Sequence, residues 1–183
     1  GLFERFPVKA VYGMHNWPGL AVGQFAVRDG PVMASSNDFT IRITGKGGHA
    51  ALPHLTVDPV LVATHVVQAL QSIVTRNKKP IDTAVLSVTK IHAGEANNAV
   101  PDSASIAGTV RTFTVETLDL VEARMRAIVE QLPRAFDAAG ALSFRRGYPP
   151  TINHSEQTEF ARAVLTDMVG AGNVFDFEPT MGA

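Results

Sequence analysis

Four polar side chains lie where the chain could do chemistry. His15 follows a strand-like segment and precedes a turn, and a neutral imidazole at a strand end is a good ligand for zinc or a similar metal. His49 stands in a glycine-rich loop, Asn98 in a second loop, and Arg111 in an alternating, strand-like segment. An arginine in such a segment could offer its planar guanidinium group to a carboxylate.

Each of these residues also has an interpretation without chemistry. The glycines beside His49 could serve only to form a turn, which would leave an ordinary surface histidine. His15 alone is not specific for a metal, and an arginine on a sheet is usually solvated or paired with a nearby acid. Taken one at a time, these residues leave both interpretations open.

The loop that carries His49 lies between a predicted strand and a predicted helix. Residues 39–44 alternate apolar and polar side chains, which is typical of a half-buried strand, and the strand is expected over residues 39–46. Asp58 can cap a helix whose first residue is Pro59. The helix is expected over residues 59–75, and its apolar face consists of Val62, Val66, Leu70 and Ile73. A strand and a helix therefore hold the His49 loop at its two ends.

Further elements are predicted along the rest of the chain. Strands are expected at residues 10–14, 23–27, 83–91, 103–113 and 141–146, a turn at residues 29–31, and a helical segment at residues 156–169. In the strand of residues 103–113, one face carries Ala104, Ile106 and Val110, and the opposite face carries Ser105, Thr109 and Arg111.

A second long helix is expected over residues 114–136. Thr114 caps it, Pro133 shortens or kinks it, and Gly140 ends it. Its buried stripe is Leu118, Val121, Met125, Ile128 and Leu132. The order from residue 39 to 148 is then strand, helix, strand, strand, helix, strand. This order predicts an α+β, ferredoxin-like (βαββαβ) fold with two helices on one face of an antiparallel sheet.

Composition excludes several classes of protein. The 183 residues suffice for one large domain or two small ones, and a net charge of −1 without a dense basic run argues against a nucleic-acid partner. The longest apolar stretch, residues 60–74, is interrupted by polar side chains, so no membrane partner is expected. Cysteine is absent, which excludes disulfides and fits a reducing compartment, so we expect a cytoplasmic protein.

The two ends of the chain are unusual. The sequence begins without an initiator methionine or a signal-peptide pattern, and it stops at Ala183 without a polar tail. We therefore expect both ends to be cut from a longer protein.

Several segments together resemble one group of enzymes. In chain order they are His15-Asn16-Trp17-Pro18-Gly19, Gly45-Lys46-Gly47-Gly48-His49-Ala50-Ala51-Leu52-Pro53-His54, Asn98-Ala99-Val100-Pro101, Gly108-Thr109-Val110-Arg111-Thr112-Phe113, Tyr148-Pro149-Pro150-Thr151-Ile152-Asn153 and Pro179-Thr180-Met181-Gly182-Ala183. The group is the metal-dependent amidohydrolases of the aminoacylase and carboxypeptidase family. It includes hippurate hydrolase, N-acyl-amino-acid hydrolases, auxin-conjugate hydrolases and N-acetyldiaminopimelate deacetylase. Each motif is weak alone, but their conjunction over essentially the whole chain is specific.

The resemblance implies an enzyme of two domains. One is an α/β catalytic domain that holds two divalent metal ions, with zinc, manganese, cobalt and nickel not distinguished. The other is an inserted ferredoxin-like domain that acts as a lid and forms a homodimer. By this resemblance residues 1–37 and 149–183 belong to the catalytic domain, and residues 38–148 form the inserted lid and dimerisation domain.

The resemblance also implies roles for the four residues. His15 matches a metal ligand, and His49 matches the histidine that reaches the active site of the partner subunit and stabilises the oxyanion. Asn98 and Arg111 match residues that hold the backbone carboxylate or carbonyl of the substrate. The implied reaction is cleavage of the amide bond of a hippurate-like or N-acetyl amino acid by metal-activated water.

The chain also departs from this family. The segments that carry the other metal ligands and the catalytic glutamate have no counterpart in the sequence. We therefore expect this polypeptide alone to be inactive and to bind no metal stably.

A non-catalytic alternative remains at this point. Ferredoxin-like domains also serve as regulatory or dimerisation modules, and a fold alone does not determine function. The motifs around His15 and Met181 lie outside the inserted domain and favour the hydrolase, because a module gives no reason for them. An RNA-binding domain is disfavoured because the strand of residues 103–113 has one aromatic side chain and no alternation of basic and aromatic residues.

Overall fold

The computed structural model describes residues 1–182 and divides into two compact units. Unit 1 consists of residues 1–32 and 152–179, and unit 2 consists of residues 33–151 together with the residues from 180 onward. No helix within residues 1–182 is both long enough and apolar enough to cross a membrane.

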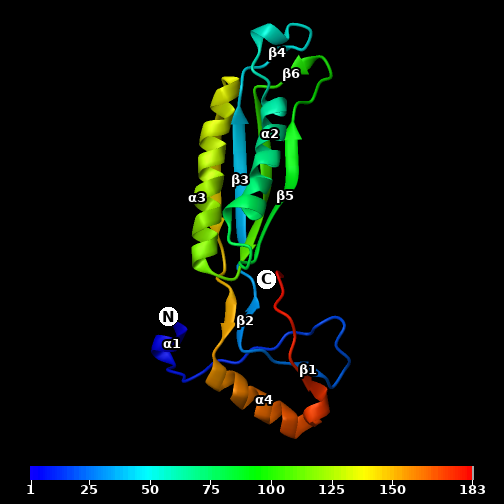
Figure 1. Ribbon diagram of the computed structural model, residues 1–183, viewed down its shortest axis with the longest axis vertical. Helices are drawn as coiled ribbons and strands as arrows, with labels where there is room; N and C mark the ends of the chain where they lie inside the picture. The colour runs from blue at the N-terminus through cyan, green and yellow to red at the C-terminus, as the bar shows by residue number, and fades with distance from the viewer. Residues whose placement is uncertain (183) are drawn as a thin grey trace. The chain divides into compact units, whose positions relative to one another are not determined.

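Unit 2 is built on a four-stranded antiparallel sheet (Figure 1). Its strands are β3 (Asn37–Thr44), β5 (Ala84–Ala93), β7 (Ser103–Thr112) and β8 (Ala139–Arg146), in the spatial order β5-β7-β3-β8. Two helices, α2 (Pro59–Ser72) and α3 (Val115–Gln131), cover one face of this sheet. The mixed helix and strand content confirms the α+β class predicted from the sequence.

The core of unit 2 lies between the two helices and the sheet. Buried and exposed residues alternate along β3, as the predicted alternation requires. The buried apolar side chains that line the core from both helices are Val62, Ala63, Val66, Leu70, Leu118, Val121, Met125 and Val129. Full burial of such a side chain contributes about 1.5–3 kcal/mol to the free energy of folding, so this layer holds the sheet and helices together.

The helix starts follow the predicted caps. The Asp58 carboxylate accepts a hydrogen bond from the Val60 N–H at 2.8 Å, and the Thr114 hydroxyl accepts one from the Thr117 N–H at 3.2 Å. α2 continues into a π-helical turn, Ile73–Asn77, and α3 continues into a 3₁₀ turn, Leu132–Phe136, that contains Pro133.

The predicted helix end at Gly140 is wrong. Asp137 adopts the left-handed conformation after the 3₁₀ turn (φ 59°), and Gly140 already lies in β8. A Cβ atom at Gly140 would meet the Val129 carbonyl oxygen at 2.2 Å. Glycine is therefore needed there because β8 passes very close to α3.

Unit 1 contains shorter elements. They are α1 (Leu2–Arg5), β1 (Phe25–Ala26), β2 (Gly30–Met33), β9 (Thr151–Asn153), α4 (Ser155–Val169), a 3₁₀ turn (Ala171–Asn173) and β10 (Val174–Phe175). Met33 at the end of β2 and Thr151 at the start of β9 are counted in unit 2. β1 pairs in parallel with β10, and β2 pairs with β9. The helix expected at residues 156–169 is confirmed as α4.

Three predictions for the first 32 residues need correction. The strand expected at residues 10–14 is irregular, because none of the described strands pairs with it and an extended segment needs a neighbour. The strand expected at residues 23–27 is reduced to β1, and the turn expected at residues 29–31 gives way at Gly30 to β2.

At one end of the four-stranded sheet, residues 45–57 and 94–102 form what we call the tip of unit 2 (Figure 1). Here the two-residue strands β4 (Gly48–His49) and β6 (Ala99–Val100) pair with each other. A 3₁₀ turn, Pro53–Leu55, follows β4. The sequence predicted only loops in both segments.

Asp102 fixes the start of the loop that carries His49. Its carboxylate accepts a hydrogen bond from the Gly47 N–H at 2.8 Å, and its carbonyl accepts one from the Gly45 N–H at 2.9 Å. A Cβ atom at Gly45 would lie 2.1 Å from the Val57 carbonyl oxygen. Gly45 is therefore required for close packing of the backbone, beyond any need for a flexible turn.

We predict that Asp102→Ala loosens this loop, whereas Asp102→Asn, which retains a side-chain oxygen, does not. Loss of the acceptor leaves the Gly47 N–H without a protein partner, so its hydrogen exchange should accelerate roughly 10-fold. The measurement is amide exchange by NMR, with the Gly45 amide as the internal control because its acceptor belongs to the backbone. Equal exchange at Gly47 in the wild type and in Asp102→Ala would contradict the prediction.

Candidate functional site

The four candidate residues are divided between the two units. His15 lies in unit 1, in an exposed irregular segment, and His49, Asn98 and Arg111 lie in unit 2. The positions of the three residues in unit 2 relative to one another can therefore be described.

The structure brings His49 and Asn98 together at the tip of unit 2. His49 pairs with Ala99, the residue after Asn98, and the Ala50 N–H donates a hydrogen bond to the Asn98 carbonyl at 3.0 Å. Both side chains are exposed. The backbones that carry an imidazole and an amide are thus neighbours at the tip, and both side chains are open to solvent.

The backbone selects the protonation pattern of the His49 ring. The Ala51 N–H donates a hydrogen bond to His49 Nδ1 at 3.1 Å. A neutral imidazole that accepts at one nitrogen carries its proton on the other. Nε2–H is then a donor, and no residue in the described part of the chain accepts a hydrogen bond from it.

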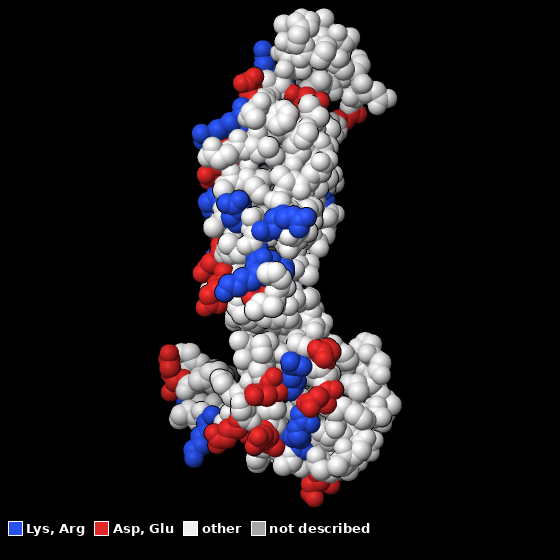
Figure 2. All heavy atoms as spheres, in the orientation of Figure 1, with Lys and Arg blue, Asp and Glu red and all other residues white. Residues whose placement is uncertain are grey.

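The surroundings of His49 are largely uncharged. Leu52 and Leu55 follow it in the loop and are about half exposed, and Figure 2 shows few charged groups over the tip on the face drawn. Hydrogen bonds and charges interact more strongly where fewer polar groups and less water surround them. A donor at His49 Nε2 is therefore placed where it could stabilise a negative oxygen effectively once water is displaced.

Arg111 lies at the other end of the sheet. β7 starts at Ser103 beside the tip, and Arg111 stands eight residues further along, opposite Val85 of β5. At about 3.4 Å per residue in an antiparallel strand, Arg111 is roughly 27 Å from the tip. Within one chain the structure therefore groups Asn98 with His49 and separates both from Arg111.

The Arg111 side chain differs from an ordinary surface arginine. Its Nη1 atom is buried and has no hydrogen-bond partner within residues 1–182, and no ion pair of Arg111 is found among them. Burial of a polar group without a partner costs free energy, so such groups are rare and call for an explanation. A carboxylate ligand that accepts two N–H bonds would satisfy this donor.

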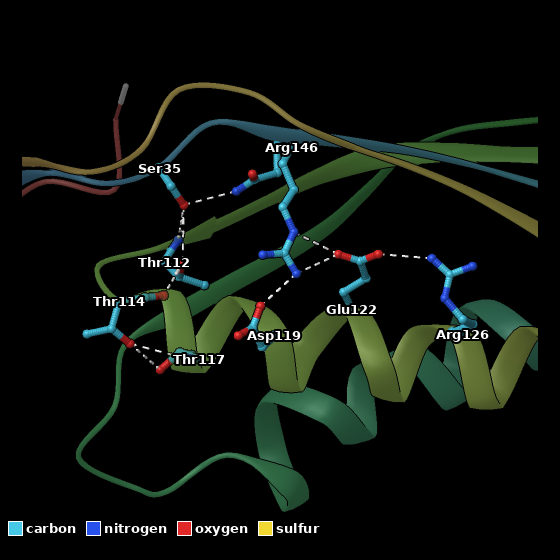
Figure 3. A network of polar contacts seen from close by, with 9 residues as sticks. Ser35, Thr112, Thr114, Thr117, Asp119, Glu122, Arg126 and Arg146 are labelled. Atoms are coloured by element: carbon cyan, nitrogen blue, oxygen red, sulfur yellow. Dashed lines mark hydrogen bonds and ion pairs between the residues drawn. The ribbon is translucent and has the colours of Figure 1, made fainter.

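A separate cluster of charged side chains, on β8 and α3, forms ion pairs among its own members (Figure 3). Arg146 of β8 pairs with Asp119 at 2.7 Å and with Glu122 at 2.8 Å, and Glu122 also pairs with Arg126 at 2.9 Å. Hydrogen bonding to Asp119 and Glu122 raises the pKa of Arg146 above its ordinary value. These charges neutralise one another, so the cluster is a structural feature of the β8 edge and not a candidate site.

The described residues do not form a metal centre. Nowhere in residues 1–182 do three or more His, Asp or Glu side chains come together closely enough to hold an ion. His15 alone therefore supplies too few ligands for a two-metal site.

Sequence reasoning missed three residues around these positions. Asp102 holds the His49 loop, and Ser35 and Asn37 contact the backbone beside Arg111. Only Asn37 carried a signal, because it is a polar residue at a core-facing position of an alternating strand. Asp102 and Ser35 look like ordinary loop residues in the sequence.

Comparison with known proteins identifies the family. Residues 34–137 match the peptidase dimerisation domain. The whole chain is 36% identical to IAA-amino acid hydrolase ILR1-like 4 of Arabidopsis thaliana, of which it covers 42%. The whole chain is also 36% identical to hippurate hydrolase of Campylobacter jejuni, of which it covers 48%.

A solved structure agrees with these matches. The Bacillus subtilis YXEP protein, described as a dinuclear metal binding peptidase from the M20 family, is 30% identical, with a TM-score of 0.74. The match covers 93% of this chain and 42% of that protein. The chain thus spans less than half the length of each of these relatives. Because the dimerisation-domain match covers more than half of the chain, this protein belongs to the M20 peptidase family of amidohydrolases and carries its dimerisation domain.

Proposed function

We propose that the chain is part of a metal-dependent amidohydrolase that cleaves the amide bond of N-acyl amino acids, such as hippurate-like or N-acetyl compounds. The observation that carries the proposal is the buried, unpartnered Nη1 of Arg111. An N-acyl amino acid has a free carboxylate, which is the acceptor that this donor lacks. The names of the matched relatives, an amino acid conjugate hydrolase and a hippurate hydrolase, support the same substrate class.

The proposal assigns residues 38–148 to a ferredoxin-like lid and dimerisation domain. The strand order β5-β7-β3-β8, with both helices on one face, supports that description. Residues 1–37 and 149–183 are assigned to the catalytic domain. The protein is proposed to be cytoplasmic.

The whole enzyme is proposed to use two divalent metal ions, with His15 as one ligand. The remaining ligands are not supplied by residues 1–182, which contain no suitable group of three. Residues 1–183 alone are therefore expected to be inactive.

Arg111 is assigned to the substrate carboxylate. Its guanidinium group can donate two parallel hydrogen bonds, which fixes both the position and the orientation of a carboxylate. This contact exists before and during the reaction, so it contributes mainly to substrate binding.

His49 is assigned to the oxygen that becomes negative when the amide carbonyl is attacked. Because Nδ1 accepts from Ala51, the Nε2–H group is available as a donor. A preplaced donor of this kind stabilises the transition state more than the ground state. The neighbouring Asn98 amide is assigned to the substrate carbonyl or carboxylate beside it.

The distance between the two ends of β7 requires two copies of the chain. An N-acyl amino acid is much shorter than the roughly 27 Å from Arg111 to the tip, at about 3.4 Å per residue. His49 and Arg111 of one chain therefore cannot hold the same substrate. The proposal accordingly takes Arg111 from one protomer and His49 from a second copy in a homodimer.

The edge strand β5 and the neighbouring helix α2 are the proposed dimer surface. The opposite edge, β8, carries Arg145, paired with Asp38, and Arg146, and charged side chains at an edge disfavour strand pairing. Residues 84–89 of β5 carry no charge. β5 carries one charged side chain, Lys90, against the two arginines of β8, so its edge disfavours pairing with a second copy less.

For the full-length enzyme, we predict that Arg111→Ala mainly raises KM for hippurate. The loss of a buried charged hydrogen-bond partner costs about 2–4 kcal/mol, which corresponds to roughly 30- to 1000-fold. Steady-state kinetics with hippurate and its carboxamide test this, because the amide lacks the carboxylate. Arg42→Ala, at an exposed position of β3, is the matched control and should leave both KM values unchanged. If Arg111→Ala raises KM equally for hippurate and for its carboxamide, Arg111 does not bind the substrate carboxylate.

We predict that His49→Ala in the same enzyme lowers kcat by about 100-fold or more and leaves KM nearly unchanged, because the oxyanion exists only in the transition state. The control is His54→Ala, which removes an exposed imidazole from the same loop. If His49→Ala has the kcat of the wild type, His49 does not stabilise the oxyanion and is an ordinary loop residue. If Arg111→Ala also leaves the steady-state kinetics unchanged, the two results together would favour a dimerisation module without catalysis.

We predict that residues 1–183 form a dimer in solution and that Thr64→Glu/Gln68→Glu on α2 converts it to a monomer. Both positions are exposed, and a symmetric pair of helices would bring the four new carboxylates close together. Ala123→Glu/Ala127→Glu places the same charges at exposed positions of α3 and should leave the dimer intact. Sedimentation velocity at micromolar concentration distinguishes the outcomes. Dissociation by the α3 variant but not by the α2 variant would move the interface to the other side of unit 2.

A further inference from the structure

Two side chains, Asn37 at the start of β3 and Ser35 just before it, hold the two peptide groups that flank Arg111. The Val110 carbonyl, on one side of Arg111, accepts a hydrogen bond from Asn37 Nδ2 at 3.1 Å. The Thr112 N–H, on the other side, donates one to Ser35 Oγ at 3.2 Å. The Ser35 N–H in turn donates to the Thr112 carbonyl at 2.8 Å.

These contacts lie where the regular pairing of β3 with β7 ends. The last paired residues of that ladder are Asn37 and Val110. Beyond them the Ser35 and Asn37 side chains continue the connection between the two segments. β5 still pairs with residues 111 and 112 on the other side of β7, through Val85 and Ala84. The Ser35 and Asn37 contacts therefore hold residues 110–112 on the side where the pairing with β3 has stopped.

The contacts belong to a buried network with little freedom (Figure 3). Ser35, Asn37 and Thr112 are each at most 2% exposed. Asn37 Nδ2 donates to Ser35 Oγ at 2.9 Å, Ser35 Oγ lies 3.1 Å from Thr112 Oγ1, and Thr112 Oγ1 donates to the Thr114 carbonyl at 3.0 Å. Breaking one contact would leave buried polar groups unpaired, so the geometry of the network is strongly favoured.

The residue type at position 37 is informative. The next core-facing residues of β3 are Phe39, Ile41 and Ile43, all apolar and buried. An apolar side chain at position 37 would continue this face without a polar group to satisfy. A buried asparagine there is explained more readily by geometry than by stability.

Arg111 needs such support. Its Nη1 has no hydrogen-bond partner in the described part of the chain, so no contact of that atom fixes the direction of the side chain. A two-pronged contact to a carboxylate requires alignment within about 0.5 Å and 10–20°. The backbone at residues 110–112 sets the point and the direction from which the Arg111 side chain starts.

We propose that Ser35 and Asn37 are positioning residues that clamp the backbone on both sides of Arg111 and so align its guanidinium group for the substrate carboxylate. The inference rests on the proposed function, in which Arg111 binds that carboxylate. Neither residue touches the substrate. Their contribution should therefore appear only for substrates that use Arg111.

The test uses Ser35→Ala in the full-length enzyme, with hippurate and its carboxamide as substrates. KM for hippurate should rise about 3- to 10-fold, as expected for the loss of one or two hydrogen bonds, while kcat and KM for the carboxamide stay within about 2-fold. Asn37→Leu, which introduces an apolar side chain of similar size and removes both donated bonds, is the second variant. It should shift KM in the same direction.

Thr114→Ala is the matched control. Thr114 belongs to the same polar cluster, but its hydroxyl contacts Thr117 and neither peptide group beside Arg111. The variant loses a helix cap and should lower the Tm, yet it should leave both KM values unchanged. Unchanged KM values with a lowered Tm show that a general loss of stability does not produce the hippurate effect.

A double variant separates this inference from the proposed function. In an Arg111→Ala background, Ser35→Ala should have no further effect on KM for hippurate, because the group that it positions is gone. If Arg111→Ala selectively impairs hippurate but Ser35→Ala behaves like Thr114→Ala or impairs both substrates equally, the clamp is overturned and the proposed function stands. If Arg111→Ala itself does not distinguish the two substrates, both are overturned.

Discussion

The antiparallel register of β7 between β3 and β5 is the constraint on which the arrangement of unit 2 depends. It places Ser103 opposite Thr44 at the tip and Val110 opposite Asn37 at the far end. It also directs Ile106 and Val110 into the core, so Arg111 faces the other way. A shift of one residue would exchange the two faces of β7 and drive Arg111 into the core, which makes the alternative register very costly.

Close packing reinforces that register at Gly108. A Cβ atom there would lie 2.0 Å from the Ser87 carbonyl oxygen of β5 and 2.7 Å from the Phe39 ring of β3. Only glycine therefore allows the three strands to approach as they do at this point. The Phe39 ring occupies the space that a side chain at position 108 would need. The large residue at position 39 therefore requires glycine at position 108.

The strongest sequence signals came from local periodicity and caps, and these were confirmed. The alternation of residues 39–44, the spacing of Val62, Val66, Leu70 and Ile73, and the caps Asp58 and Thr114 all reflect interactions within a few residues. The errors lie where a distant partner decides the structure. Residues 10–14 are apolar enough for a strand but have no paired neighbour among the described strands, and β4 and β6 are two-residue strands about 50 residues apart without a local signal.

The same distinction applies to the candidate site. The residue types of His49, Asn98 and Arg111 were visible in the sequence, but their separation follows from the register of β7. The family resemblance implies that Asn98 and Arg111 each hold the substrate carboxylate or carbonyl, which stays a prediction. It gives no sign that the Asn98 backbone lies next to the His49 strand. The support of Arg111 by Ser35 was also hidden, since a serine before a strand has no feature that separates it from a loop residue.

Under the proposed function, this separation links assembly to chemistry. One end of the sheet contributes a carboxylate-binding guanidinium group, which acts throughout the reaction, and the other contributes a donor that acts mainly in the transition state. Since a single chain cannot bring both ends to one small substrate, a monomer could bind but would lack the oxyanion donor. Dimerisation would then complete the catalytic site itself, and the long rigid sheet would have to keep the two ends at a constant separation. Small displacements of residues along β7 would add up at its two ends, where function depends on position. Three features limit such displacements: the tightly specified register, the glycine at position 108 and the buried polar network beside Arg111.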